Sequence, residues 1–231
     1  MRSTVLAGGI AILLLAACQQ AAPGATAEAT ASDAAGPILP PLAEGETPPG
    51  DPTPVRLGPE AVWNGTLEHC RREDDAVDTC LIDAMRANNA PAAAIAASQR
   101  LRGRGEVAHV AAWAERDGVG IATIRHPFRA NTNQGTWLVD ARGRATDVDS
   151  LAESALSVPS IETFRATHPD ARLFAPAEFA GRQALPGGSV RFVYATPIRT
   201  CRACDTLGHL QVAYDFDGDR EFAGQQVLGI E

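Results

Sequence analysis

The chain has 231 residues and a formal net charge of −8 at pH 7, with 28 acidic and 20 basic side chains. An acidic chain gains no counterion-release attraction to DNA or RNA, so nucleic acid is excluded as a partner. Every basic residue is an arginine, which excludes the P-loop lysine, Schiff-base catalysis and the Ser-Lys nucleophile. The sequence also lacks the G-x-S-x-G and H-E-x-x-H motifs. These absences leave no recognisable catalytic set and favour a non-enzymatic role.

The first eighteen residues form an export signal. Arg2 supplies a positive charge, and residues 5–17 are an uninterrupted run of apolar residues and glycine. This run is long enough for a signal-peptide core and too short to cross a bilayer as a helix. It ends in Leu15-Ala16-Ala17-Cys18, which resembles the lipobox of bacterial lipoproteins.

The resemblance to bacterial lipoproteins implies that residues 1–17 are removed and that Cys18 begins the mature chain. Cys18 would then carry a diacylglycerol thioether and an acylated, palmitate-type amine, and three acyl chains hold a protein stably to a membrane. Gln19 replaces the aspartate that commonly retains such lipoproteins in the inner membrane. We therefore expect an anchor in the outer membrane of the cell envelope, with the chain facing the periplasm. An ordinary secretory peptide cut elsewhere is the alternative.

Residues 18–58 are expected to be a disordered tether behind the anchor. The stretch is rich in alanine, proline and glycine, holds eight of the 16 prolines and contains no aromatic residue. Such a composition cannot bury enough surface to offset the entropy of ordering. Residues 59–231 are then a single globular domain, long enough for one hydrophobic core.

The first part of this domain is expected to be helical. Gly58-Pro59 is a typical helix start, with proline at the first helical position. A second helix is predicted to begin near Asp74-Asp75 and to end at Asn88-Asn89, and a third to run from Pro91 to about Leu101.

Strands are expected to dominate after residue 106. Residues 107–115 and 119–125 flank Asp117-Gly118, a strong hairpin signal, and further strands are predicted at 136–140, 188–196, 207–216 and 221–230. Helices are predicted at 150–157 and at 160–167, the latter with Ser160 as its N-cap. Short helices followed by a mostly antiparallel sheet with intervening helices indicate a single-domain α+β fold.

Four cysteines remain once Cys18 is assigned to the anchor. In an oxidising periplasm an even count indicates two disulfides, and the spacing favours Cys70 with Cys80 and Cys201 with Cys204. The C-x-x-C pair at 201 and 204 is the sharpest chemical motif, because Arg202 beside it can stabilise a thiolate. A structural bridge is the favoured interpretation, and a redox-active pair is the alternative.

Two further stretches are candidate sites. The loop after residue 124 is rich in side chains that suit a carboxylate or sugar-like ligand; its candidate residues are Arg125, His126, Arg129, Asn131, Asn133 and Trp137. An ordinary connector is the competing interpretation. The turn near the C-terminus carries four alternating carboxylates, a weak calcium candidate whose spacing departs from the EF-hand; these are Asp215, Asp217, Asp219 and Glu221. A solvated hairpin turn is favoured there, so neither a metal nor a cofactor is expected.

These observations together favour a non-enzymatic binding or envelope-assembly module, tethered to the membrane through Cys18. Its expected partner is an envelope protein or polymer. A thiol-disulfide oxidoreductase using Cys201 and Cys204 is the alternative function.

Overall fold

The computed structural model describes residues 57–67, 70, 77–103, 105–150 and 158–231. The signal peptide, Cys18 and all but the last two residues of the tether lie outside this part of the chain. The predicted helix start at Asp74-Asp75 and nearly all of the helix predicted at 150–157 lie outside it as well. Within the described residues, no helix is long and apolar enough to cross a membrane.

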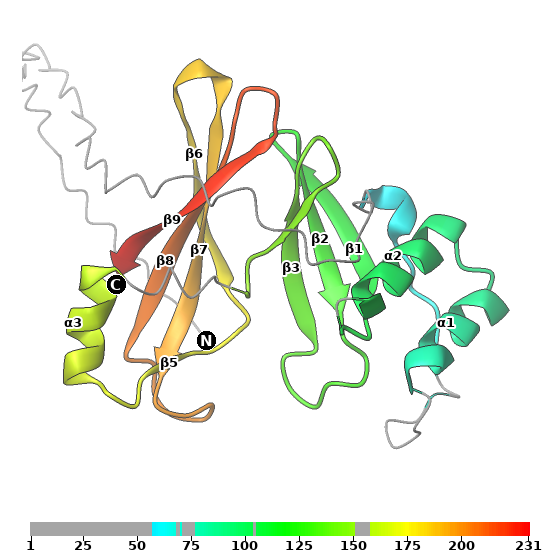
Figure 1. Ribbon diagram of the computed structural model, residues 1–231, viewed down its shortest axis with the longest axis horizontal. Helices are drawn as coiled ribbons and strands as arrows, with labels where there is room; N and C mark the ends of the chain where they lie inside the picture. Colours follow the sequence, from blue (N-terminus) through cyan, green and yellow to red (C-terminus); the bar gives the residue numbers. More distant parts are fainter. Residues whose placement is uncertain (1–56, 68–69, 71–76, 104, 151–157) are drawn as a thin grey trace, which may run out of the picture. The chain divides into compact units, whose positions relative to one another are not determined.

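The predicted α+β class is confirmed: the described residues form helices and two antiparallel sheets. Helices α1 (Val77–Ala87) and α2 (Ala92–Gly103) precede the first strand, and α3 (Pro159–Thr167) lies between the two sheets in sequence. Asn89 follows α1 with a φ of 52°, the left-handed conformation in which asparagine often ends a helix. Figure 1 shows these elements coloured along the chain.

The helix expected after Gly58-Pro59 is only a single 3-10 turn, η1 (Pro59–Ala61). After this turn the chain runs alongside strand β1 (His109–Arg116). Val62 forms an isolated parallel bridge with Val110, and the Trp63 N–H donates to the Val110 carbonyl at 2.9 Å. Pairing with a strand thus overrides the local helix-start signal of Gly58-Pro59.

Sheet A is a four-stranded meander in the order β1-β2-β3-β4. Its strands are β1 (His109–Arg116), β2 (Val119–Arg125), β3 (Gln134–Val139) and β4 (Ala145–Asp147). Asp117 and Gly118 join β1 to β2 with φ values of 53° and 79°. Two positive φ angles are what a two-residue hairpin turn requires, and the Asp-Gly pair adopts them at low cost.

Sheet B is built around the long hairpin of β7 and β8, in the order β5-β7-β8-β9, with β6 also pairing with β7. Its strands are β5 (Arg172–Leu173), β6 (Glu178–Ala184), β7 (Val190–Arg199), β8 (Gly208–Phe216) and β9 (Phe222–Ile230). The short β5 pairs with the Ile198–Arg199 end of β7, and β6 pairs with the Val190–Ala195 part. The sequence predicted one sheet, whereas the strands divide into two.

Each face of sheet A contributes residues to a separate core. Val119 and Leu138 belong to a core shared with sheet B, whereas Ile124 and Trp137 belong to a second core with η1 and α2. This alternation follows from the two-residue period of a strand. A third, smaller core holds Trp63 and the buried faces of α1 and α2.

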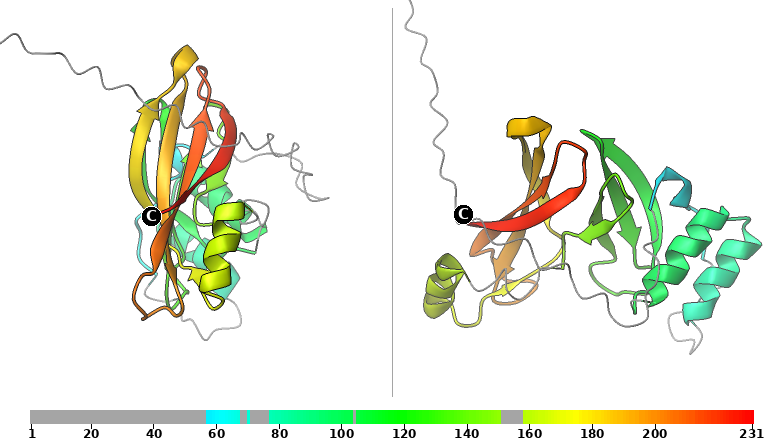
Figure 2. Two further views of the ribbon diagram at one scale, coloured as in Figure 1. Left: turned by 90° about the vertical axis from the view of Figure 1, so that its left-hand side faces the viewer. Right: turned by 45° about the horizontal axis from the view of Figure 1, so that its top comes forward.

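Helix α3 packs beside the end of β9, as Figures 1 and 2 show from several directions. Its N-cap is Val158 rather than the predicted Ser160, because Pro159 occupies the first helical position. Proline is favoured there, since its fixed φ suits the helix and its missing N–H would have no partner in the first turn. His168 ends the helix as predicted.

Candidate functional site

The predicted ligand loop connects β2 to β3 and is closed by its own backbone. The His126 N–H donates to the Asn133 carbonyl at 2.8 Å, and the Arg129 N–H donates to the His126 carbonyl at 3.2 Å. Asn131 and Asn133 are exposed, as is Arg125 at the end of β2. Trp137 is not part of the loop surface, because it is 7% exposed and packs in the core with α2. The loop surface therefore lacks Trp137, the one aromatic residue among the candidate ligand-binding residues.

Glu106, in the segment before β1, contacts Arg129 and His126 of this loop. Its carboxylate forms an ion pair and a hydrogen bond with Arg129, and one oxygen lies 3.3 Å from Nδ1 of His126. That nitrogen is buried and has no properly oriented hydrogen-bond partner among the described residues. Burial, and next the positive charge of Arg129, lower the pKa of His126, while Glu106 opposes the shift. The arginine and histidine thus have an internal partner that sequence reasoning missed, since Glu106 lies 23 residues before Arg129.

A second buried imidazole, His109, lies at the start of β1. It is 3% exposed and meets Trp63 edge to face, with 5.1 Å between ring centroids. Burial lowers its pKa to about 4, assisted by the charges of Arg125 and His126. His109 is therefore a neutral core residue at neutral pH.

Two carboxylates complete the polar group at this end of sheet A. Asp147 accepts the Asp149 N–H at 2.9 Å, and Asp149 accepts the N–H groups of Ala177 at 2.6 Å and Thr136 at 3.4 Å. Burial raises the pKa of Asp147 to about 6 and also raises the pKa of Asp149. A Cβ at Gly135 would lie 3.0 Å from Asp149 Oδ2 and 3.9 Å from His126 Nε2, so glycine allows both side chains to approach β3.

The polar group formed by Glu106, His126, Arg129, Asp147 and Asp149 is largely satisfied by its own contacts. Glu106 joins the loop to the segment before β1, and Asp149 joins the segment after β4 to Thr136 of β3 and to Ala177. Contacts of this kind are typical of a structural network. No group of three histidine, cysteine or acidic side chains that could hold a metal ion occurs among the described residues.

Both expected disulfides are present in the structure. Cys70 is bonded to Cys80, and Cys201 to Cys204. The second bridge lies in the β7–β8 connection, where Cys201 is exposed and Cys204 is partly exposed. Arg202 between them donates to Thr132 Oγ1 at 2.8 Å, so this connection contacts the loop between β2 and β3.

The carboxylates of the acidic turn at residues 215–221 have different partners. Asp215 forms a two-bond ion pair with Arg191 at 2.7 and 2.8 Å, and Glu221 accepts from Arg142 at 2.6 Å. Asp217 accepts the backbone N–H groups of Asp219 and Glu221 at 3.0 and 2.8 Å. This is the pattern of a hairpin turn held by an aspartate side chain.

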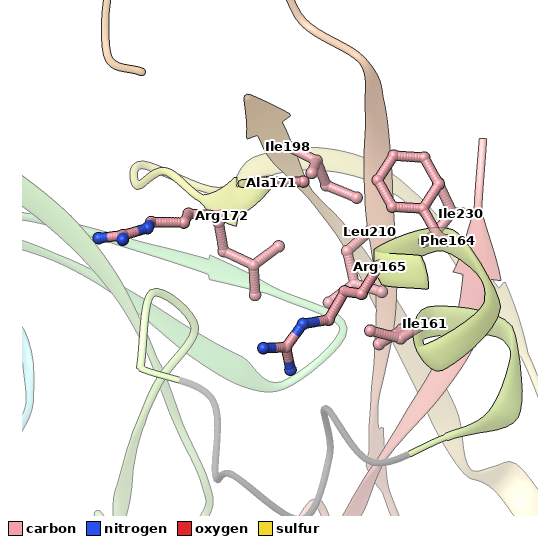
Figure 3. Close-up of a pocket in the computed structure, with 9 residues that line it drawn as sticks. Ile161, Phe164, Arg165, Ala171, Arg172, Ile198, Leu210 and Ile230 are labelled. Carbon is pink, nitrogen blue, oxygen red and sulfur yellow. The ribbon is translucent and has the colours of Figure 1, made fainter. Parts of the chain in front are cut away.

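A pocket that the sequence did not reveal lies between α3 and sheet B. Its volume is about 240 Å³, and Figure 3 shows its apolar side chains gathered between the helix and the strands. The lining residues are Ile161, Phe164, Arg165, Ala171, Arg172, Leu173, Ile198, Leu210 and Ile230. They come from α3, the segment after it and four strands, so no local motif brings them together. The apolar period of residues 160–167 predicts a buried helix face and cannot predict the gap left beneath it.

No known family model, curated protein or solved structure matches this chain.

Proposed function

We propose that this protein is a lipid-anchored, non-enzymatic binding module of the bacterial envelope, whose folded domain takes an apolar ligand into the pocket beneath α3. The pocket is the observation that carries the proposal. Small-molecule sites are concave and mostly apolar with a few polar groups, and seven of the nine lining residues here are apolar. The loop between β2 and β3 is less suited to a ligand, because Arg129 and His126 already contact Glu106.

The pocket is large enough to hold part of a small molecule. An apolar cavity of about 150 Å³ binds benzene, so the pocket volume of about 240 Å³ admits a somewhat larger apolar group. An envelope protein or polymer that bears such an apolar group would bind in the pocket, and this protein would then act in envelope assembly.

The uncharged dye N-phenyl-1-naphthylamine, which fluoresces in apolar surroundings, tests this proposal. The test protein is residues 19–231, which contain every described core residue and lack the acylated cysteine. We expect one dye per chain, and a loss of affinity of roughly tenfold when Ala171→Leu fills the pocket. Ala166→Leu, at an exposed position of α3, is the matched control and should bind as the unchanged protein does. No dye binding, or equal binding by both variants, would refute the proposed function.

The anchor belongs to the same proposal and rests on the lipobox-like residues 15–18. We place the protein at the outer membrane, facing the periplasm, because Gln19 follows the cysteine. Mass spectrometry of the N-terminal peptide should find Cys18 with a diacylglyceryl group and an acylated amine. An unmodified amine at residue 18 or beyond would remove the anchor and leave the pocket proposal in place.

A second candidate function is thiol-disulfide exchange at Cys201 and Cys204. The exposure of Cys201 and the neighbouring Arg202 favour it, because an accessible thiolate beside a cation is the reactive form of a cysteine. A glutathione redox titration with mapping of each bridge distinguishes the roles. A reduction potential of about −120 to −200 mV supports exchange, and one below about −300 mV assigns the bridge to structure.

A further inference from the structure

The two charged side chains that line the pocket are both arginines. Arg165 and Arg172 are exposed, and none of the described residues that line the pocket is acidic. Figure 3 shows their guanidinium ends reaching away from the apolar side chains. Arginine commonly covers apolar surface with its stem while its charged head stays in water. The pocket thus combines an apolar interior with a positive rim.

Among the described residues these two arginines have no acidic partner, unlike many others in this acidic chain. Within the described residues, Arg129, Arg142, Arg144, Arg182 and Arg191 each form an ion pair with a carboxylate. Neither Arg165 nor Arg172 forms a hydrogen bond or an ion pair with any described residue.

The neighbouring strand end adds to the positive charge. Arg172 is paired in register with Arg199 across β5 and β7, and Arg199 donates only to neutral oxygens, those of Thr206 and the Arg202 backbone. Arg202 next to it contacts Thr132 and the ring of Phe174. Four arginines on α3, on β5 and at the end of the β7–β8 hairpin therefore form no ion pair with a carboxylate of the described residues. A cation that has no carboxylate partner favours an anionic ligand over a neutral or cationic one.

We propose that the pocket binds a single-chain anionic amphiphile, with its acyl chain between α3 and sheet B and its carboxylate or phosphate head at Arg165. This inference rests on the proposed function and adds the chemical class of its ligand. The planar guanidinium matches both head groups, since its N–H donors can hold two oxygens at once. Scaling from benzene in a cavity of about 150 Å³, the pocket holds about ten carbons. A membrane-anchored domain would meet such molecules in the envelope.

Displacement of N-phenyl-1-naphthylamine from residues 19–231 by four ten-carbon competitors tests the inference: decanoate, decyl phosphate, 1-decanol and decyltrimethylammonium. We expect both anions to displace the dye with an affinity at least threefold higher than that of 1-decanol. The cation should displace the dye more weakly than 1-decanol does. A preference for one of the two anions identifies whether carboxylate or phosphate is the natural head. Shorter chains should lose about fourfold in affinity per methylene removed.

The variant Arg165→Gln should weaken the binding of decanoate about three- to tenfold, because its head group loses a partner. The affinity for 1-decanol should change by less than about twofold, since the alcohol has no charged head group. Arg86→Gln on α1 makes the same change in net charge away from the pocket residues and is the matched control. Equal competition by all four molecules would overturn the inference, as would an unchanged decanoate affinity in Arg165→Gln. In both cases dye binding that Ala171→Leu weakens would leave the proposed function standing, whereas absence of dye binding would remove both.

Discussion

Burial of the Asp147 carboxyl group disfavours its charged form. Its pKa is raised to about 6 from an ordinary value of 3.8, so the folded state holds a proton more tightly than the unfolded chain does. Such a group contributes stability at low pH that is lost as the pH rises toward 6. His109 acts in the opposite direction: its pKa is lowered to about 4, so the stability that it contributes is lost as the pH falls from about 6.5. The two effects partly cancel between pH 4 and 6.

Replacing Asp147 by asparagine separates these effects. The amide oxygen can still accept the Asp149 N–H, so the variant removes the buried charge and keeps the hydrogen bond. We expect Asp147→Asn to be more stable by about 2 kcal/mol at pH 7.5, and the gain to vanish by about pH 4. In the variant, the free energy of unfolding should rise more between pH 4 and 6.5 than it does in the unchanged protein, because His109 and His126 remain and Asp149 is left to oppose them. Urea unfolding at several pH values measures the free energy of unfolding of the variant and of the unchanged protein.

The control for this prediction is Asp170→Asn, which makes the same change in charge at an exposed position. It should show no comparable pH-dependent gain. A loss of stability in Asp147→Asn that is the same at pH 5 and pH 8 would mean that the carboxylate charge itself is needed.

Tyr214 provides a hydrogen bond between sheet B and the segment after β4. It is fully buried, and its hydroxyl donates to the Val148 carbonyl at 3.2 Å. Tyr214→Phe should cost about 1 to 2 kcal/mol, because a buried carbonyl loses its donor. Tyr194→Phe is the matched control: this residue packs edge to face on Tyr214, and its hydroxyl has no hydrogen bond with a described residue. Thermal unfolding that shows the larger loss for Tyr194→Phe would contradict this assignment.

The two disulfides differ in how much of the chain they close. The Cys70–Cys80 bridge spans ten positions and ties residue 70 to α1, whereas the Cys201–Cys204 bridge spans three. In the chain-entropy model the longer loop contributes about 3 kcal/mol and the shorter one about 2 kcal/mol. We expect the Cys70→Ala/Cys80→Ala variant to be the less stable of the two double variants, and α1 to lose protection from hydrogen exchange. Loss of protection in β7 with α1 unaffected would contradict this prediction.

The sequence predicted those elements whose signals are local. Asp117-Gly118 indicated the β1–β2 hairpin, and the apolar residues of 207–216 and 221–230 indicated β8 and β9 within one residue. Strand β6 was not predicted, because most of its residues are exposed and it shows no alternation of apolar and polar side chains. It is a strand only because β7 offers it a partner. The division into two sheets likewise depends on strand pairing over long sequence distances, which local patterns do not encode.

The candidate sites show the same division between local and distant information. The cysteine spacing favoured the pairing that the structure contains, since each bridge closes a short loop. The composition of residues 125–137 indicated a ligand loop, but its histidine and arginine bind Glu106 and its tryptophan lies in a core. The pocket was not foreseen, because it requires α3 and four strands to meet.

At the scale of the whole molecule, one core joins the two sheets and extends to the pocket, because the lining residues Ile161, Ile198 and Leu210 belong to it. The core shared by the sheets contains Val119 and Leu138 of sheet A together with Phe192 and Tyr214 of sheet B. Arg220 adds a polar contact, because its guanidinium donates to the backbone carbonyls of Asp117 and Gly188. Helix α3 packs against β9, and its Ile161 belongs to the same core as Val119 and Leu138.

The most direct test of the proposed function is methyl NMR of residues 19–231 titrated with 1-decanol. We predict saturable shifts at Ile161, Ile198, Leu210 and Ile230, which line the pocket, and no shift at Ile124 in the core between sheet A and α2. Ala171→Leu should remove these shifts. Shifts spread over both sheets, or none at saturating ligand, would contradict a ligand site between α3 and sheet B.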